Sequence, residues 1–328
     1  MTISSPRQRL SVIIAATRNC LPAKIIMTAE PLLILVNRKA GTAKKMGHTR
    51  LLETLERVNR SVQLHWLDPA DLSAYIQQLV DDGNINELAV GGGDGTINHT
   101  IQHLVGTNIV LFPLPLGTMN HFVKDLDLPV RLEEFLPLLN SNRRSRQIDV
   151  GCVNSQYFLN NVSLGMYPRV VRYRGVVRFS QRFPKLIATA YALTKVLLRH
   201  QSRRSFTWRT DKGDDISSPV FLIANNRYKF DITSLVHRER LDEGHLMIIA
   251  PTDVRLPTLL EAILYAWTDR VEYASRLDVR AVKDIIINVD SDSTHAVIDG
   301  ELTRLDTPIK LHLKKAALRV VDSLDTDN

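Results

Sequence analysis

The chain has 328 residues, enough for two domains, and its 42 Lys and Arg against 35 Asp and Glu give a formal net charge of +7. With 44% hydrophobic and 23% charged residues it has a globular composition, and no stretch reaches the ~18 uninterrupted apolar residues of a membrane span, which excludes an integral membrane protein. Two cysteines, Cys20 and Cys152, exclude a disulfide framework and indicate a reducing, cytoplasmic setting.

Residues 1–29 carry Arg7, Arg9, Arg18 and Lys24 but no acidic residue, and they include a short apolar run. Two interpretations stay open for this segment. It is a targeting sequence, or it is a loosely structured extension upstream of the real start of the protein at Met27.

From residue 30 to 129 apolar runs and helical patterns alternate. PLLILVN (31–37) is a continuous apolar run, as expected of a parallel strand that is buried on both faces. The alternation predicts a doubly wound α/β domain. Its further elements are a helix at 51–58, a strand at 61–67, a helix at 71–80 with Asp71 as N-cap, a strand at 87–90, a helix at 96–105 and a strand at 108–114.

After Pro129 the pattern changes to short strands, which predicts a second domain, mostly antiparallel β with helical insertions, over residues 130–322, followed by a tail at 323–328. A linker helix is expected at 132–139 and helical insertions at 184–200 and 256–268. The expected strands are 147–153, 157–164, 218–226, 245–251, 284–290, 295–301, 309–313 and 318–322.

A glycine turn, VGGGDGTINH (90–99), follows the strand at 87–90. Consecutive glycines let the backbone approach a ligand closely, and the N–H groups that open the next helix can face an anion. The turn is not a P-loop, because no Lys follows it, and it is not a dinucleotide fingerprint, because Thr96 stands where the last glycine should be.

Asp94, at the centre of this turn, would repel a phosphate unless it binds a metal or accepts a proton. Either use indicates phosphoryl transfer. The alternative is that Asp94 only caps the following helix.

Two neighbouring strands end in similar turns, VNRKAGT (36–42) and PLGTMNHF (115–122). Since the carboxyl ends of parallel strands share one edge of a sheet, the three turns together predict a nucleotide-binding edge.

These motifs resemble the diacylglycerol kinase catalytic-domain family, which also includes sphingosine kinases, ceramide kinases and bacterial lipid kinases. GGDGTIN (92–98) and PLGTMNHFVKDLDLP (115–129) match its two central motifs, and VNRKAG (36–41) is a looser version of its first. FLNNVSLG (158–165), LDEGHLMI (241–248) and IDGE (298–301) are similar to later segments of the family, in the same order.

The resemblance implies a lipid kinase that transfers the γ-phosphate of ATP to a lipid hydroxyl, diacylglycerol-like or related, with Mg²⁺ as cofactor. Glu301 would be the general base, supported by Asp299, and Asp94 would organise Mg²⁺ and phosphate. A structural Mg²⁺ would be held by Glu243 and by the carbonyl groups of Arg240 and His245. ATP would be bound by Asn37, Gly41, Gly92, Gly93, Asp94, Gly95, Thr96, Ile97, Asn98, Gly117, Thr118 and Asn120.

The residues themselves leave alternatives. Asp299 and Glu301 could be only a solvated hairpin turn, since Asp-Gly is a common turn signal. His121 replaces the family's usual acidic residue, which keeps open a catalytically silent nucleotide- or lipid-binding protein. A soluble-substrate kinase of the NAD-kinase type also shares the GGDG sequence.

The positive charge is concentrated between residues 150 and 210, which hold eleven Lys and Arg and no Asp or Glu. The segment 169–209 is therefore expected to bind an anionic membrane surface peripherally, with a basic amphipathic helix near 184–200, or else to pack that helix on the sheet of the second domain. Since no nucleic-acid-binding motif accompanies the charge, we expect no nucleic-acid partner. The sequence leaves open whether the chain forms a homodimer.

Overall fold

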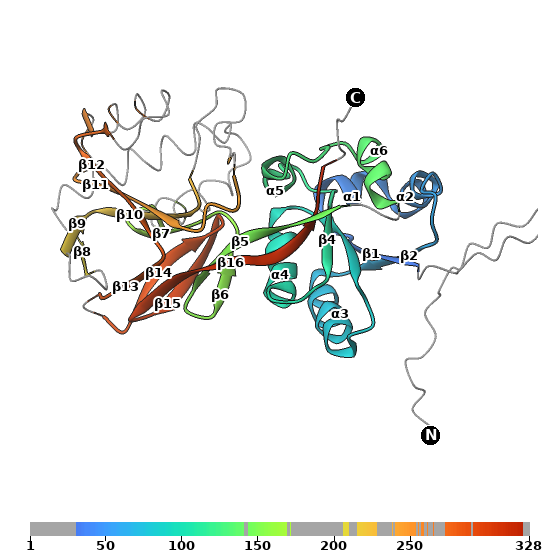
Figure 1. Cartoon of the computed structure of the whole chain (residues 1–328), viewed down its shortest axis with the longest axis horizontal. Coiled ribbons are helices and arrows are strands. Elements are labelled where there is room, and N and C mark those ends of the chain that lie inside the picture. The colour runs from blue at the N-terminus through green and yellow to red at the C-terminus, as the bar shows by residue number, and fades with distance from the viewer. Residues whose placement is uncertain are drawn as a thin grey trace, which may run out of the picture. The chain divides into compact units, whose positions relative to one another are not determined.

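The computed structural model describes residues 31–140, 144–168, 171, 206–209, 215–227, 238, 240–253, 255, 257–258, 261, 265, 273–289 and 291–323 (Figure 1). The chain divides into two compact units. Of the described residues, unit 1 holds those from 31 to 146 and from 319 to 323, and unit 2 holds those between 147 and 318. The sequence places the boundary at residue 129, whereas this division assigns the described residues between 130 and 146 to unit 1.

Unit 1 is built on a parallel sheet in the order β2-β1-β3-β4, which the last residues of β16 extend beside β4. Leu32 to Val36 of β1 are all buried, as expected of a central strand with helices on both faces. Its elements are β1 (Leu32–Asn37), α1 (Gly41–Met46), α2 (His48–Leu55), β2 (Val62–Leu67), α3 (Pro69–Asp82), β3 (Glu87–Gly92), α4 (Asp94–Leu104), β4 (Val110–Pro115), α5 (His121–Asp125), α6 (Leu132–Phe135) and a 3₁₀ turn at Leu136–Leu139.

The direction of winding reverses between β1 and β3. From β1 the chain moves outward to β2 through α1 and α2, and it then returns through α3 to β3 on the other side of β1. Figure 1 shows α3 and α4 on one face of the sheet, and α1 and α2 on the opposite face. Ligands of such sheets bind where the order reverses, beyond the carboxyl ends of the strands.

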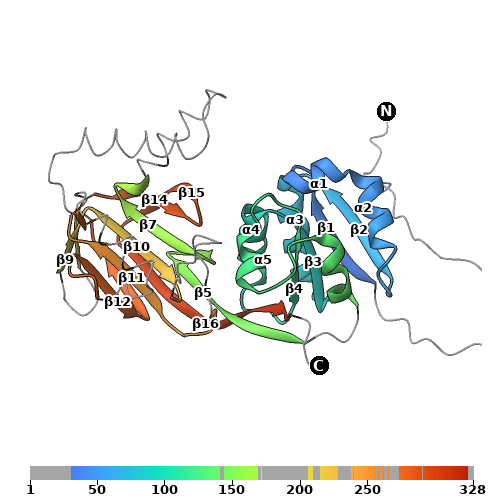
Figure 2. The ribbon, with the colours of Figure 1, turned by 90° about the horizontal axis from the view of Figure 1, so that it is seen from above.

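Unit 2 contains a six-stranded antiparallel sheet in the order β12-β11-β10-β7-β14-β15, and residues of β5, β6, β13 and β16 form further antiparallel pairs (Figure 2). Buried aliphatic side chains and the rings of Phe158 and Phe221 make up its core. Its strands are β5 (Ser145–Val153), β6 (Gln156–Phe158), β7 (Asn161–Gly165), β8 (Phe206–Arg209), β9 (Asp215–Ser218), β10 (Val220–Asn225), β11 (Leu246–Pro251), β12 (Leu277–Val282), β13 (Asp284–Ile287), β14 (Ser293–Ile298), β15 (Glu301–Asp306) and β16 (Ile309–Val321).

The predicted fold class is confirmed: an α/β sheet unit is combined with an antiparallel β unit. Several elements differ in detail. The N-cap position of α3 is Asp68, not Asp71, because Pro69 occupies the first helical position, where a missing N–H costs nothing. The predicted strand 157–164 is two strands, and the predicted strands 309–313 and 318–322 are one, β16.

Most of the predicted helical insertions at 184–200 and 256–268, like the extension 1–29 and most of the basic segment 169–209, lie outside the described residues. Within the part of the chain that is described, none of the helices has the length and apolar character needed to cross a bilayer.

Candidate functional site

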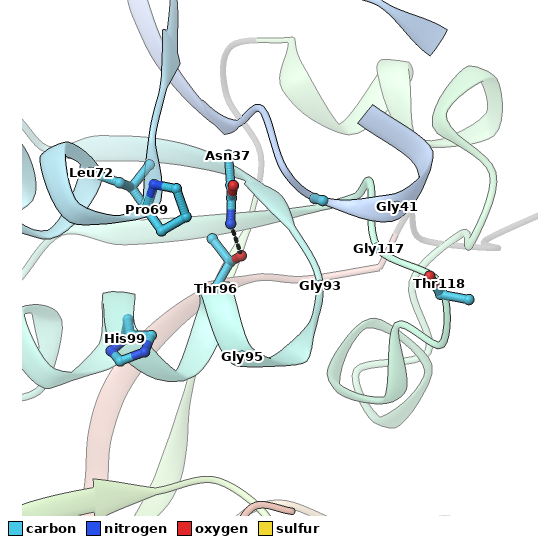
Figure 3. Close-up of a pocket in the computed structure, with 11 residues that line it drawn as sticks. Asn37, Gly41, Pro69, Leu72, Gly93, Gly95, Thr96, His99, Gly117 and Thr118 are labelled. Atoms are coloured by element: carbon cyan, nitrogen blue, oxygen red, sulfur yellow. Dashed lines mark hydrogen bonds between the residues drawn. The ribbon is translucent and has the colours of Figure 1, made fainter. Parts of the chain in front are cut away.

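Three turns at the carboxyl edge of the parallel sheet in unit 1 meet at one place. The first turn follows β1, and Asn37 connects it to the glycine turn. Its Oδ1 accepts a hydrogen bond from the N–H of Lys39 at 2.9 Å, and its Nδ2 donates to Oγ1 of Thr96 on α4 at 2.9 Å (Figure 3). Asn37 therefore fixes the first turn to the helix that follows the glycine turn.

The glycine turn itself joins β3 to α4 with little room for side chains. A Cβ on Gly92 would lie 2.4 Å from Cβ of Thr96, so the strand can end against the helix only with a glycine there. Gly93 occupies the N-cap position of α4 and offers no capping side chain. The first N–H groups of α4 have no acceptor within the helix, and Gly95 and Thr96 line the cavity in front of them. This arrangement suits an anion.

Asp94 does not cap its own helix. It is the first helical residue, and its Oδ1 accepts a hydrogen bond from the N–H of Phe122 at the start of α5, at 3.1 Å. The carboxylate thus links the second turn to the third. Its other oxygen, Oδ2, has no hydrogen-bond partner among the described residues, which leaves it available to a cation.

The third turn, after β4, packs backbone to backbone against the second. A Cβ on Gly117 would lie 2.3 Å from Cα of Gly93, closer than any real carbon contact. Asn120, which adopts a left-handed φ of 50°, accepts the N–H of Gly117 on Oδ1 at 3.0 Å. Thr42 of α1 donates from Oγ1 to the carbonyl of Gly117 at 2.6 Å. Gly117 is consequently held from three sides.

The three turns surround a cavity of about 310 Å³, drawn in Figure 3. Of the twelve residues predicted to bind ATP, seven line it: Asn37, Gly41, Gly93, Gly95, Thr96, Gly117 and Thr118. The other five, which are Gly92, Asp94, Ile97, Asn98 and Asn120, do not line it. Ile97 is 2% exposed and belongs to the core, whereas Asn120 and Asp94 accept hydrogen bonds from backbone N–H groups of the third turn and of α5.

Four residues that we did not predict also line the cavity: Ala40, Pro69, Leu72 and His99. Pro69 and Leu72 begin α3 directly after β2, and His99 is one turn into α4 (Figure 3). Pro69 and Leu72 could have been found from the sequence, since β2 lies beside β1 and its carboxyl end shares the same edge of the sheet.

In unit 2, Asp299 and Gly300 form the two-residue turn between β14 and β15, with φ of 48° and 88°. The Asp299 carboxylate accepts three backbone N–H groups, from Leu159 at 2.7 Å, Asn160 at 2.7 Å and Asn161 at 2.9 Å. The turn is therefore not simply solvated, because it is anchored to the start of β7.

Burial raises the pKa of Asp299, while its three N–H donors and the positive charge of Arg238 oppose that rise. Arg238 is 1% exposed, and it donates to Oδ1 of Asn160 at 2.8 Å and to the carbonyl of Leu159. The half-buried carboxylate of Asp299 and the buried guanidinium of Arg238 thus hold the same segment of backbone. Glu301, two residues after Asp299, is exposed at the start of β15, and its carboxylate has no hydrogen-bond partner among the described residues.

The predicted metal loop lies between residues 240 and 245. Glu243 accepts the N–H of Arg227 on Oε2 at 2.8 Å, and the same oxygen lies 3.5 Å from Nε2 of His245. Asp149, which is 1% exposed, accepts the N–H of Gly244 on Oδ2 at 2.7 Å and that of Ala316 on Oδ1 at 2.8 Å. Among the described residues, no group of three His, Cys, Asp or Glu could hold a metal ion. The loop is tied down by protein hydrogen bonds.

Comparison with known proteins matches residues 31–153 to the family model of the diacylglycerol kinase catalytic domain. "Probable lipid kinase YegS-like" from Pseudomonas aeruginosa (strain UCBPP-PA14) is 26% identical over 272 residues, covering 80% of this chain and 87% of that protein. "Probable lipid kinase YegS" from Escherichia fergusonii is 28% identical, covering 79% and 88%. "Diacylglycerol kinase" from Staphylococcus saprophyticus is 22% identical, covering 68% and 78%.

Solved structures share the fold. One from Bacillus anthracis str. Sterne superposes with a TM-score of 0.64 at 20% identity, and another from that organism, described as a diacylglycerol kinase, does so with a TM-score of 0.59 at 19% identity. Each comparison covers 89% of this chain and 97% of the other.

Proposed function

Because this chain belongs to the diacylglycerol kinase catalytic-domain family, we propose that it is an ATP-dependent lipid kinase that phosphorylates the hydroxyl group of a diacylglycerol-like lipid. The observation that carries the proposal is the close packing of the three turns in unit 1. Glycines without room for a side chain bring backbone N–H groups and the hydroxyl groups of Thr96 and Thr118 around one cavity. Such a cavity is built for phosphate groups.

In this proposal, the turns act by positioning. Phosphoryl transfer needs little covalent chemistry from the protein, so catalysis consists mainly of orientation and charge neutralisation. The N–H groups at the start of α4 would donate hydrogen bonds to phosphate oxygens, and Thr118 would contact the phosphate from the third turn.

Mg²⁺ fits the residues that are present. Mg²⁺ in kinases is usually held by one or two carboxylates together with substrate phosphates, and when bound it neutralises charge on the phosphate oxygens. Oδ2 of Asp94 is the oxygen that would contact it, since Oδ1 is committed to Phe122. The same hydrogen bond would keep Oδ2 oriented.

Glu301 is the proposed general base. Its carboxylate is exposed and unpaired in the described structure, so it can accept a proton from a lipid hydroxyl without first breaking an ion pair. General-base assistance is typically worth ~10²–10⁴-fold in rate. Asp299 would act indirectly, by fixing the turn that sets the direction of Glu301.

A structural Mg²⁺ at the loop 240–245 stays part of the proposal. Oε1 of Glu243 and the carbonyl groups of Arg240 and His245 are its candidate ligands, although the carbonyl of His245 already accepts the N–H of Asn226 at 3.1 Å. Peripheral binding of an anionic membrane through residues 169–209 is likewise proposed from the sequence alone.

The test is transfer of radiolabelled phosphate from ATP to diacylglycerol, monoacylglycerol, phosphatidylglycerol, ceramide and sphingosine in mixed micelles with Mg²⁺. Asp94→Asn and Glu301→Gln are the informative variants. Asp71→Asn, on the exposed first turn of α3, and Asp306→Asn, an exposed residue at the other end of β15, are their matched controls.

If a lipid is labelled by the parent protein and by the two control variants, but not by Asp94→Asn or Glu301→Gln, the proposal is supported and the substrate class is identified. Labelled product from NAD without any lipid would replace it with a soluble-substrate kinase. Intact ATP binding without turnover on any acceptor would indicate a silent binding protein, as the His121 substitution allows.

A further inference from the structure

A second, positively charged pocket lies in unit 1, beside the cavity already described. It has a volume of about 630 Å³ and is formed by the loop after β1, the helices α1 and α2, and the end of β2. The two pockets share no lining residue, but both use the loop after β1. Arg38 and Lys39 line the second pocket, and Asn37, Ala40 and Gly41 line the first. Its lining consists of Arg38, Lys39, Lys44, Gly47, His48 and Trp66.

Cations outnumber carboxylates in this pocket. Arg38 and Lys39 are bound to Asp68, the first through Nε at 2.8 Å and the second through Nζ at 3.3 Å, and their side chains remain 52% and 68% exposed. Burial acts to raise the pKa of Asp68, but the hydrogen bonds and positive charges of Arg38 and Lys39 together outweigh it and lower that pKa. The ammonium group of Lys44 has no hydrogen-bond or ion-pair partner among the described residues. Three positive side chains against one carboxylate leave an excess of 3 − 1 = 2 charges.

The backbone and the aromatic side chain add to the same site. α2 begins at His48 after Gly47, with no side-chain cap and no acidic residue in its first turn, so its N–H groups carry an uncompensated partial positive charge. The ring of Trp66 packs edge-to-face on His48, with centroids 5.6 Å apart, and makes an apolar wall.

We propose that this pocket binds an anion that carries a phosphate monoester group, as a site separate from the nucleotide cavity. A phosphate monoester carries about −1.5 to −2 charges near neutral pH, which matches the excess of two positive charges better than a carboxylate would. Lys44 would supply a free point charge, and Arg38 would donate from Nη1, since its Nε and Nη2 contact Asp68. The N–H groups at the start of α2 would be the backbone donors. The phosphate group can come from a free phosphate compound or from a lipid head group.

Trp66 provides a direct readout that does not depend on turnover. The chain has three tryptophans, so Trp208→Phe with Trp267→Phe leaves Trp66 as the sole fluorophore. Inorganic phosphate is titrated into this protein in the presence of saturating ADP and Mg²⁺, which occupy the nucleotide cavity. We expect a saturable change in Trp66 emission that Lys44→Ala weakens about tenfold or more, since a hydrogen bond to a charged group is lost.

The matched control is Lys45→Ala, which removes the neighbouring exposed lysine of α1 that does not line the pocket. Sedimentation with phosphatidylcholine vesicles, with and without phosphatidic acid, separates the two sources. A saturable fluorescence response to inorganic phosphate assigns the site to a free phosphate compound. If only the vesicle experiment responds, so that phosphatidic acid increases the fraction of protein that sediments and Lys44→Ala removes this increase, the site is assigned to a lipid head group.

No saturable response in either experiment, or equal losses in Lys44→Ala and Lys45→Ala, would overturn the proposal. Melting temperatures of the variants are compared with that of the parent protein, and because both lysines are exposed, we expect no change in folding.

Discussion

Adding one methyl group at either of two facing glycines should have very different effects. In Gly117→Ala the new Cβ would lie 2.3 Å from Cα of Gly93 and 2.6 Å from Oδ1 of Asn120, so the second and third turns must move apart. In Gly93→Ala the new Cβ would lie 3.5 Å from Cα of Gly117, an ordinary van der Waals distance. Both substitutions add one methyl group to a glycine, and the contrast lies in what that group would meet.

Overpacking of this kind typically costs about 1–3 kcal/mol of folding free energy. Each kcal/mol lowers the melting temperature of a domain by roughly 2–8 °C, depending on its size, so we expect Gly117→Ala to lower that of unit 1 by on the order of 5–10 °C. Gly93→Ala should leave the melting temperature nearly unchanged.

Differential scanning calorimetry measures both variants, and titration calorimetry with Mg²⁺ and ATP measures nucleotide binding. Gly117→Ala should also weaken ATP binding, because the displaced turn carries Thr118. If Gly117→Ala melts and binds ATP like the parent protein, or if both variants are destabilised equally, the inferred close packing of the turns is wrong.

Three further substitutions test single hydrogen-bonded side chains. Asp149→Asn places an NH₂ group against the N–H of Gly244 or Ala316, and should lower the free energy of unfolding of unit 2 by about 1–3 kcal/mol in a urea titration. Asp299→Asn replaces a carboxylate oxygen that accepts a hydrogen bond from Leu159, or from Asn160 and Asn161, and we expect it to destabilise unit 2 by about 2 kcal/mol. It should lower kcat while changing the KM for ATP less, and an unchanged kcat would refute the positioning role of Asp299. Burial lowers the pKa of His103, whose Nδ1 lies 2.7 Å from Oε1 of Gln77 and whose Nε2 lies 2.8 Å from Oγ of Ser73. A lowered pKa in the folded state gives stability above pH 6.5 that is lost as the pH falls, so unit 1 should melt at a lower temperature at pH 5 than at pH 7, and His103→Asn should reduce that difference.

The meeting of the three turns at one edge of the sheet could be predicted because it depends on strand order and on glycine. A buried run such as residues 32–36 has one interpretation, and three such runs in a doubly wound sheet bring their ends to one edge. What the sequence could not reveal is the role of each residue there. Asp94 in the turn suggested contact with a ligand or with its own helix, and the structure adds a hydrogen bond to Phe122.

Long-range hydrogen bonds explain most of the errors in strand boundaries. YFLNNVSL reads as one strand, but it is broken at residues 159 and 160 because their N–H groups donate to Asp299, about 140 residues later. β16 continues through a region where two strands were expected. It accommodates a left-handed φ of 50° at Ala316, whose N–H is taken up by Asp149. Such partners are invisible in local periodicity.

The position of β16 has a consequence for synthesis of the protein. In the sheet, β16 lies between β4 and β5, although in the chain it follows every other described strand. Until Arg319 and Val320 are made, the backbone of β4 that pairs with them has no neighbour on that side. The nascent chain must therefore keep this edge open while all of unit 2 is translated, and it is then exposed to pairing with other chains. Unit 1 can therefore be completed only after unit 2 has been translated.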